Sequence, residues 1–337
     1  MEVPVATERN SIQARSRAWL RASLSQIRVQ ARRPGDFAFR VLLYLFVGIV
    51  LVIVLGIGWV LLSSSWPTIQ QFGFKYLTNP AFDPIHNTFG VGPALFGTFF
   101  TSAFAILLAV PLSVGTAIFL TEFCPRRLRF PLAFLVDTLA AIPSVAIGLW
   151  GFLVFAPWLQ QTGEPWLQQH LGFLPFFQGT PYGVGMLAAG LILTAMILPI
   201  ITAISREVMV VVPVSQREAM LALGATRWEV IRYAVLPYGR VGITGGAILG
   251  LGRALGETIA VTLVIGNQAT PPSASLFQTG YTLSSVIVNQ FGEATPGVFL
   301  SAVLEAGLLL LLITLLTNIL ARLLIARMGR VGGGLTA

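Results

Sequence analysis

Long apolar runs alternate with short polar segments along most of this chain. A helix needs about 20 apolar residues to cross roughly 30 Å of hydrocarbon. Runs of at least this length cover residues 39–62, 94–120, 131–156, 183–204, 241–265 and 298–325. The pattern therefore predicts an all-α integral membrane protein with six transmembrane helices.

One polar segment, residues 205–240, separates the fourth and fifth apolar runs and is called the polar island below. Ser-x-x-Glu at 215–218 and Thr-x-x-Glu at 226–229 both have the spacing of a capping box, which begins a helix. Gly224 between them suits the left-handed residue that ends a helix, and Pro237 is expected to end the second one. The sequence predicts two short helices joined at a glycine turn.

The surface of the polar island has two interpretations. Ala219, Ala222 and Leu223 are small or apolar and suit a shallow groove on a partner protein. Alternatively, Glu218 and Glu229 only cap helices and the segment is a long loop. Capping does not explain why an ordered helical hairpin stands beside a membrane bundle, so we favour a docking role.

Charge is scarce and unevenly placed. Charged residues make up 10% of the 337 residues, whereas a soluble domain has about a quarter. Arg residues gather before the first run, between the second and third runs, in the island and after the last run. In the other loops Lys75 is the only lysine or arginine. This positive-inside bias predicts that both termini and the island are cytoplasmic. It also explains the net charge of +8 without a nucleic-acid partner.

The expected organisation is a basic N-terminal segment, 1–38, followed by one membrane domain, 39–330. The basic segment is either an interfacial helix, with Trp19 and Leu20 among its arginines, or a mobile tail. Cys124 is the only cysteine, and two distant histidines, His86 and His170, do not suggest a metal site.

The fifth run carries the most specific chemistry. Gly242, Gly246 and Gly250 recur at the spacing that lets helices approach closely in lipid. Arg253 and Glu257 are expected on one helix face near the middle of the bilayer, where a charge costs about 2.5–3.5 kcal/mol. They are either a structural ion pair or part of a path for an oxyanion, which the planar guanidinium group of arginine matches.

Other charges in or near the runs are weaker candidates. Asp137 in the third run and Glu305 in the sixth are expected to meet Arg253 or each other. Glu122 is expected to form a surface pair with Arg126 and Arg127.

The chain resembles the permease subunits of ABC importers. Glu218-Ala219, Gly224 and Leu236-Pro237 match the family's EAA loop, although Met220 and Ala234 replace the more usual Ala and Ile. The segments 245–258 (GGAILGLGRALGET), 259–267 (IAVTLVIGN) and 139–150 (LAAIPSVAIGLW) are similar to the PstC-type permease of phosphate-specific importers. The resemblance covers roughly residue 88 to the C-terminus.

The resemblance implies a type I, MetI-like permease fold in a bacterial inner membrane. It implies that the island docks on a cytoplasmic ATPase dimer of the PstB type. A PstA-type second permease and an external PstS-type phosphate-binding protein are the other implied partners. The residues assigned to ATPase coupling are Glu218, Ala219, Gly224, Thr226, Glu229, Leu236 and Pro237, and those assigned to the path are Arg253, Glu257 and Asp137.

No phosphate-binding loop, nucleophile–base pair or metal-ligand cluster occurs in the sequence. We therefore expect a transport subunit with no catalytic residues, metal or cofactor, and an ATPase on separate chains. The nearest alternative is a permease for another oxyanion, such as molybdate or sulfate. An ion-coupled transporter or channel would leave the island unexplained. A membrane sensor is disfavoured because the sequence offers no sizeable cytoplasmic domain for it.

Overall fold

The computed structural model describes residues 34–270 and 273–332, and these are helical with connecting turns. Within these ranges the only strand-like contacts are the isolated bridges Asp83–Thr88 and Gly266–Gly280. The chain divides into two units, Met1–Val60 and Leu61–Ala337, and each is described by itself. Most of the predicted basic segment 1–38, including Trp19 and Leu20, lies outside the described residues.

Six helical stretches within the described residues are long and apolar enough to cross a membrane, as the sequence predicts. They are Phe39–Phe72, Gly92–Phe123, Ser144–Leu171, Met186–Val210, Arg227–Gly256 and Val298–Arg327. The number of spans is therefore confirmed, but the third and fifth are placed differently from the prediction.

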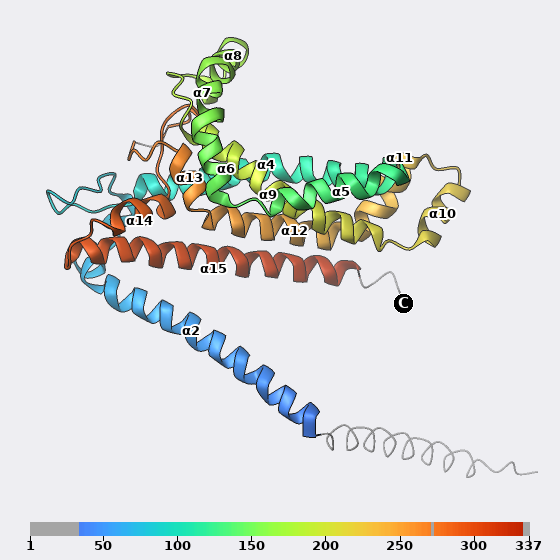
Figure 1. Ribbon diagram of the computed structural model, residues 1–337, viewed down its shortest axis with the longest axis horizontal. Helices are drawn as coiled ribbons and strands as arrows, with labels where there is room; N and C mark the ends of the chain where they lie inside the picture. The colour runs from blue at the N-terminus through green and yellow to red at the C-terminus, as the bar shows by residue number, and fades with distance from the viewer. Residues whose placement is uncertain (1–33, 271–272, 333–337) are drawn as a thin grey trace, which may run out of the picture. The chain divides into compact units, whose positions relative to one another are not determined.

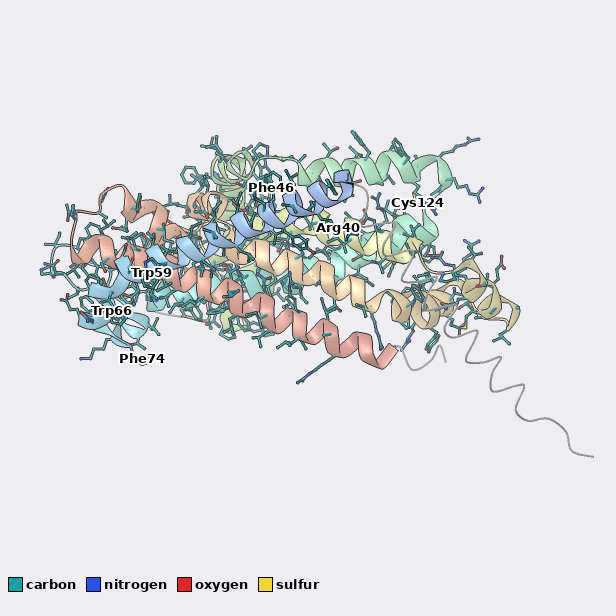
Figure 2. All side chains as sticks on the ribbon, turned by 90° about the horizontal axis from the view of Figure 1, so that it is seen from below. Arg40, Phe46, Trp59, Trp66, Phe74 and Cys124 are labelled. Carbon is teal, nitrogen blue, oxygen red and sulfur yellow. The ribbon has the colours of Figure 1, made fainter. Side chains whose placement is uncertain are left out.

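The described residues of the first unit lie in α2, Pro34–Phe72, whose last residues, from Leu61, belong to the second unit. Between Val41 and Leu62 this helix is apolar around its whole circumference. Figure 2 shows the side chains of Phe46 and Trp59 along this helix. A helix that is apolar on every side has no water-facing stripe, as expected of a membrane span.

The second unit contains the remaining helices, labelled in Figure 1. In its first half lie α3 (Lys75–Thr78), α4 (Gly92–Ile118), η1 (Phe119–Phe123), α5 (Arg126–Ala140), α6 (Ser144–Trp150), η2 (Gly151–Phe155), α7 (Ala156–Trp158), η3 (Leu159–Gly163), α8 (Glu164–Leu171) and η4 (Pro175–Phe177). In its second half lie α9 (Met186–Val210), α10 (Val214–Ala222), α11 (Arg227–Val230), η5 (Ile231–Val235), α12 (Leu236–Gly256), α13 (Ile259–Val264), α14 (Leu283–Phe291) and α15 (Val298–Gly332). The elements η1, η2, η3 and η5 are π-helical turns, whereas η4 is a short 3₁₀ helix.

The third predicted span, 131–156, is wrong as a single helix. α5 ends at Ala140, and α6 begins after Pro143, whose backbone is extended. Proline disfavours helical geometry in the residue before it, so the apolar run is divided at this point. The helix then continues from Ser144 to Leu171, which is well beyond residue 156, the predicted end of the span.

The fifth span also differs from the prediction at both ends. Pro237 does not end the second island helix, because η5 leads directly into α12 with the proline in its first turn. The first turn of a helix tolerates proline, and the preceding π turn relaxes the usual backbone hydrogen-bond spacing. At the other end, α12 stops at Gly256 and Glu257 is extended, so 241–265 is not one continuous helix.

The helix α9 lies at the centre of the second unit and packs along both α4 and α12. In the most apolar stretch of α9, 67% of the residues are buried, which is a larger share than in any other candidate span. Gly246 of α12 faces Ile204 of α9, and a Cβ atom added at this glycine would lie 3.2 Å from the Cβ of Ile204. Gly242 and Gly250 meet Val208 and Ile201 of the same helix, which confirms the close-packing face predicted from their spacing.

Two ends of the second unit can be distinguished. α10 and α11 lie at the end called the island end, and α8 and α14 lie at the opposite end (Figure 1). At the opposite end the hydroxyl of the buried Tyr76 donates to the Ala302 carbonyl at 2.6 Å, and burial raises the pKa of this hydroxyl well above its usual value. Here the Asp83 carboxylate pairs with His86 at 2.6 Å, and hydrogen bonding from His86 lowers the pKa of Asp83.

The contact between α9 and α12 predicts unequal effects of two neighbouring substitutions. Gly246→Val would place three carbon atoms against Ile204, and overpacking of this kind costs about 1–3 kcal/mol. Gly245 points elsewhere, with its nearest neighbour, Ile325 Cδ1, 3.8 Å from an added Cβ. We expect Gly246→Val to lower the melting temperature in detergent by several degrees and Gly245→Val to change it little. Equal melting temperatures for the two variants would contradict this packing.

Candidate functional site

The helix α10, Val214–Ala222, ends in a Schellman motif at Gly224. Gly224 has φ +85°, its N–H donates to the Leu221 carbonyl at 2.9 Å, and the Ala225 N–H donates to the Met220 carbonyl at 3.1 Å. These bonds satisfy carbonyls that the end of the helix leaves without partners. The glycine turn is therefore found where the sequence predicts it.

The two predicted capping boxes have different outcomes. At 226–229, the Glu229 N–H donates to Thr226 Oγ1 at 3.3 Å, and Glu229 Oε2 accepts from the Thr226 N–H at 2.7 Å. This capping box is confirmed. The one at 215–218 is wrong, because α10 begins at Val214 after Pro213 and no side chain caps it. Pro213 fixes an extended backbone immediately before α10, which leaves Ser215 inside the helix.

The helix α10 has one face toward the bundle and one toward its surroundings. Arg217 and Met220 are partly buried, and Met220 packs against a cluster around Met209 at the island end. Glu218 and Ala219 are exposed, and the large apolar Leu221 and Leu223 are 50% and 84% exposed. An apolar surface of this kind, on a polar segment, is typical of an interaction site.

The other predicted coupling residues lie near this face but are not equivalent. Gly224, Thr226 and Glu229 are exposed in the turn and the start of α11. Leu236 is partly buried and packs against the same cluster as Met220. Pro237 is exposed within the continuing helix.

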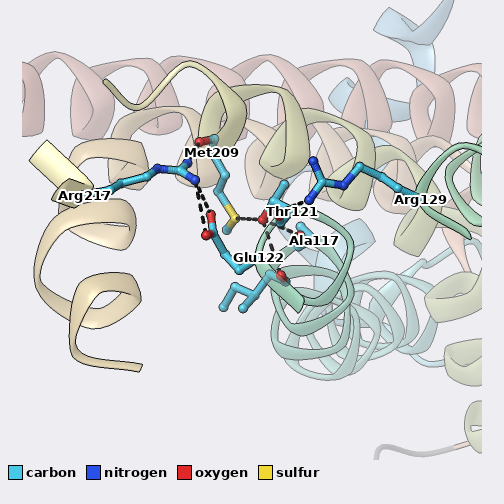
Figure 3. A network of polar contacts seen from close by, with 7 residues as sticks. Ala117, Thr121, Glu122, Arg129, Met209 and Arg217 are labelled. Carbon is cyan, nitrogen blue, oxygen red and sulfur yellow. Dashed lines mark hydrogen bonds and ion pairs between the residues drawn. The ribbon is translucent and has the colours of Figure 1, made fainter. Parts of the chain in front are cut away.

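The structure also joins α10 to the bundle by a polar contact that sequence reasoning missed. Arg217 Nη1 lies 2.9 Å from Glu122 Oε1 in η1, and Arg217 Nη2 donates to the Met209 carbonyl at 2.6 Å. Figure 3 shows Arg217 between these two partners. The predicted pairing of Glu122 with Arg126 and Arg127 is therefore wrong. The true partner is 95 residues away in the sequence, so local spacing could not reveal it.

Arg253 lines a hollow of about 480 Å³ together with residues of α9, α12 and α15. The lining residues are Ile200, Leu249, Gly252, Arg253 and Asn318. Among the described residues, no carboxylate forms an ion pair with Arg253. Sequence reasoning missed Asn318, although an asparagine within a mostly apolar run was an available signal.

Glu257 does not share a helix face with Arg253, contrary to the prediction. The helix α12 ends at Gly256, and Glu257 has φ −69° and ψ 130°, which is extended. The Thr258 hydroxyl donates to the Gly256 carbonyl at 3.2 Å, and the Ser284 hydroxyl donates to the Glu257 carbonyl at 2.8 Å. These side-chain bonds satisfy carbonyls at the end of α12, where the last carbonyls of a helix have no intrahelical partner.

The two remaining acidic candidates do not meet Arg253 or each other. Asp137 Oδ2 lies 3.3 Å from Arg206 Nη2, and this pair connects α5 with α9. Glu305 is 6% exposed in α15, and its Oε2 has no hydrogen-bond partner among the described residues. Asp137 is also outside the third candidate span, which begins at Ser144.

Comparison with known proteins identifies the architecture. Residues 109–330 match the family model described as "Binding-protein-dependent transport system inner membrane component". The chain belongs to this family of ABC importer permeases. It is accordingly a multi-pass inner-membrane transport subunit rather than an enzyme.

Curated relatives place this permease in the PstC group. It is 46% identical to the "Phosphate transport system permease protein PstC" of Mesorhizobium japonicum over 83% of this chain and 86% of the relative. It is 43% identical to the Haemophilus influenzae protein of the same name, over 86% of this chain and 92% of that protein. Both matches thus cover more than four fifths of each chain.

Solved structures support the permease fold. A chain of a bacterial alginate ABC transporter, in complex with an alginate pentasaccharide-bound periplasmic protein, has TM-score 0.56 at 16% identity. The match covers 85% of this permease and 94% of the alginate transporter chain. At this identity the likeness concerns the fold alone, and it agrees with the predicted type I, MetI-like architecture.

The unequal capping at the two predicted helix starts gives a direct test in the permease. Thr226→Ala removes the side chain that caps α11, at a cost of about 1 kcal/mol, whereas Ser215→Ala removes no cap. We expect amide hydrogen exchange at residues 227–230 to become about fivefold faster in Thr226→Ala. Exchange at the start of α10 should be unchanged in Ser215→Ala, and faster exchange there would show that Ser215 does act as a cap.

Proposed function

We propose that this chain is the transmembrane permease subunit of an ATP-driven importer for inorganic phosphate. The observation that carries the proposal is its 46% identity, over 83% of its length, to a protein named as a phosphate transport system permease. The path would form between this chain and a second permease subunit of the PstA type. An external PstS-type protein would deliver phosphate, and a PstB-type ATPase dimer would supply the energy.

Arg253 is the residue proposed to meet the anion. In this chain without its partners the side chain of Arg253 is exposed, and it lines the same hollow as Asn318. A guanidinium group matches the tetrahedral oxygens of phosphate, and the amide of asparagine adds a hydrogen-bond donor. No carboxylate pairs with Arg253 within the described residues, so none offsets its attraction for an anion. This supports a path role over a structural ion pair.

Glu257 keeps a proposed role near the path, but not as a same-face partner of Arg253. It is partly buried at the interruption between α12 and α13. Its negative charge would limit the time that an anion stays near Arg253. Asp137 is left out of the proposed path because Arg206 already pairs with its carboxylate.

The outer face of α10 is the proposed docking site for the ATPase. Ala219, Leu221 and Leu223 provide an exposed apolar surface, and Glu218 adds a charged group beside it. The chain itself has no phosphate-binding loop, so the energy for transport must enter from another subunit. Closure of the ATPase dimer on ATP would move α10 and rotate the spans between inward-open and outward-open states.

The proposed orientation puts the island end and both termini in the cytoplasm. Arg126, Arg127 and Arg129 at the start of α5 and Arg217 of α10 belong to this end, since Arg129 and Arg217 both contact the segment around η1. Basic residues are retained on the cytoplasmic side of membrane proteins. The opposite end, with the loops around α8 and α14, would then receive the external binding protein.

The nearest alternative is that this chain is a permease for another oxyanion, because molybdate and sulfate are also tetrahedral anions. The names of the relatives favour phosphate. An ion-coupled transporter is not favoured, since it would need no docking surface on α10.

The path proposal predicts a selective transport defect for Arg253→Gln. In vesicles containing the whole importer and saturating binding protein, we expect uptake of labelled phosphate to fall at least tenfold, because a neutral amide attracts the anion less strongly. Arg253→Lys keeps the charge but not the planar fork and should be intermediate.

The matched control for this prediction is Arg206→Gln, which removes a partly exposed arginine of α9 paired with Asp137. It should transport phosphate nearly as well as the wild type. Unchanged uptake by an intact Arg253→Gln complex would remove Arg253 from the path. Wild-type uptake of sulfate or molybdate in preference to phosphate would instead overturn the assigned substrate.

The docking proposal predicts that Leu223→Glu separates the permease from its ATPase. A charge placed at this 84% exposed apolar side chain would have to be buried against the partner, which is unfavourable without a matching cation. We expect at least a tenfold loss of ATPase co-purified with the permease pair. Leu128→Glu, at a 52% exposed leucine of α5, is the control and should retain the ATPase. Equal retention by both variants would refute docking at Leu223.

A further inference from the structure

A single arginine joins the island helix α10 to the ends of two other helices. Arg217 Nη1 lies 2.9 Å from Glu122 Oε1 and donates to Glu122 Oε2 at 3.2 Å. Its Nη2 donates to the Met209 carbonyl at 2.6 Å. Glu122 belongs to η1, which extends α4, and Met209 lies in the last turn of α9. This arrangement, Arg217 with Glu122 and the Met209 carbonyl, is called the arginine clamp below.

The clamp is the only ion pair between α10 and another helix in the part of the chain that the structure describes. Another inward contact of α10 is made by Met220, which packs in the apolar cluster at the island end. An apolar contact can slide with little change in energy, whereas an ion pair with hydrogen bonds depends on direction and distance. The clamp is thus a directional attachment of α10 to the bundle, beside its apolar contacts.

The surroundings of the clamp strengthen it. The Arg217 and Glu122 side chains are 23% and 16% exposed, so solvent screens this pair less than a surface pair. Arg217 also brings a positive charge to the carbonyl end of α9, where the helix dipole is negative.

The same end of α4 receives a second arginine from α5. Arg129 Nη2 donates to the Thr121 carbonyl at 2.6 Å, and Thr121 Oγ1 donates to the Ala117 carbonyl at 2.9 Å (Figure 3). The residue beside Glu122 is therefore itself held in place. A force applied to Glu122 would be passed to an ordered segment rather than to a frayed helix end.

One buried donor nitrogen of Arg217, Nε, has no hydrogen-bond partner among the described residues. Glu122 Oε1 lies 2.9 Å from Arg217 Nη1 but is not bonded to it in hydrogen-bond geometry. Buried groups of this kind are uncommon in folded proteins. The clamp as observed thus joins Arg217 to Glu122 by one hydrogen bond and one charge contact, both from Nη1.

We propose that the arginine clamp transmits the movement of α10 to α4 and α9, so that Arg217 and Glu122 are positioning residues for coupling ATP hydrolysis to transport. This inference rests on the proposed docking of the ATPase on α10. It assigns separate tasks to the two faces of the helix. Exposed Leu221 and Leu223 bind the ATPase, and partly buried Arg217 carries its motion into the bundle.

The first test measures phosphate taken up per ATP hydrolysed in vesicles containing the complete importer. Glu122→Gln and Arg217→Gln should each lower this ratio at least fivefold, while the ATPase still co-purifies and still hydrolyses ATP. Arg206→Gln is the matched control at the same end of the molecule and should keep the wild-type ratio. Wild-type ratios in both clamp variants would overturn the proposal, and so would loss of the ATPase from both.

Charge exchange distinguishes a direct pair from general damage to the fold. Glu122→Arg and Arg217→Glu should each be defective alone, because each places like charges together. The double variant restores the attraction but not the bond to the Met209 carbonyl, so at least a threefold recovery of the ratio is expected over either single variant. No recovery in an assembled double variant would mean that the pair itself does not carry coupling.

A distance measurement tests the transmission directly. Cys124, the only cysteine, is buried and can be replaced by alanine, which leaves spin labels only at Ser215→Cys on α10 and Phe119→Cys on η1. Both chosen sites are exposed. In the complete importer the distance between labels should stay the same with and without a non-hydrolysable ATP analogue. It should become broadly distributed when Glu122→Gln is added.

These experiments separate the inference from the function on which it rests. If the ATPase fails to co-purify with the wild-type permease pair, the docking proposal fails. If it co-purifies but the label distance in the wild type changes on adding the ATP analogue, α10 moves independently of α4 and the clamp proposal fails.

Discussion

The close approach of α9 to α4 and α12 is the constraint on which the rest of this fold depends. In lipid, apolar side chains gain little by leaving their surroundings, so helices associate through close packing and hydrogen bonds. Gly246 and Gly250 allow α12 to meet Ile204 and Ile201 of α9, and Gly190 allows α9 to meet the ring of Phe104 of α4. The Ser113 hydroxyl of α4 adds a bond to the Leu198 carbonyl of α9 at 2.9 Å.

The same packing fixes the positions of the polar groups. With α9 held in the centre, its last turn is placed beside η1, and Arg217 of α10 can reach both. Further along α12, Arg253 lies in a hollow bordered by Ile200 of α9 and Asn318 of α15. The glycine-rich contact between α9 and α12 therefore lies between the proposed docking face and the proposed anion site. Loss of this contact would displace both sites.

Features governed by local sequence were predictable. The six apolar runs, the glycine turn at Gly224, the cap at Thr226 and the glycine face of α12 each follow from residues close together in the chain. The errors came from competition between neighbouring signals. At Ser215 the preceding Pro213 set the helix start, and at Pro237 a π turn allowed the helix to continue.

The candidate site was predictable only in part, for a related reason. The exposed residues of α10 and the unusual position of Arg253 are visible in the sequence. The partners are not: Glu122 is distant from Arg217, Arg206 is 69 residues from Asp137, and Asn318 comes from the last span. Such pairs are set by the packing of whole helices. The end of α12 at Gly256 was also missed, because the bonds from Thr258 and Ser284 that stabilise it lie outside the helix.

The interruption after Gly256 divides the fifth predicted span into two helices, α12 and α13, that need not rotate together. The helical stretch Arg227–Gly256 runs without a break from the island end, so torque applied there is carried along its length. It is not carried further as rotation of a rigid rod, because Glu257 is extended. The following helix, α13, is packed against α6 and α14 at the opposite end. Arg253 lies in the last turn of α12. Rotation of α12 about its axis would therefore move the guanidinium group of Arg253 while α13 and its loops keep their place.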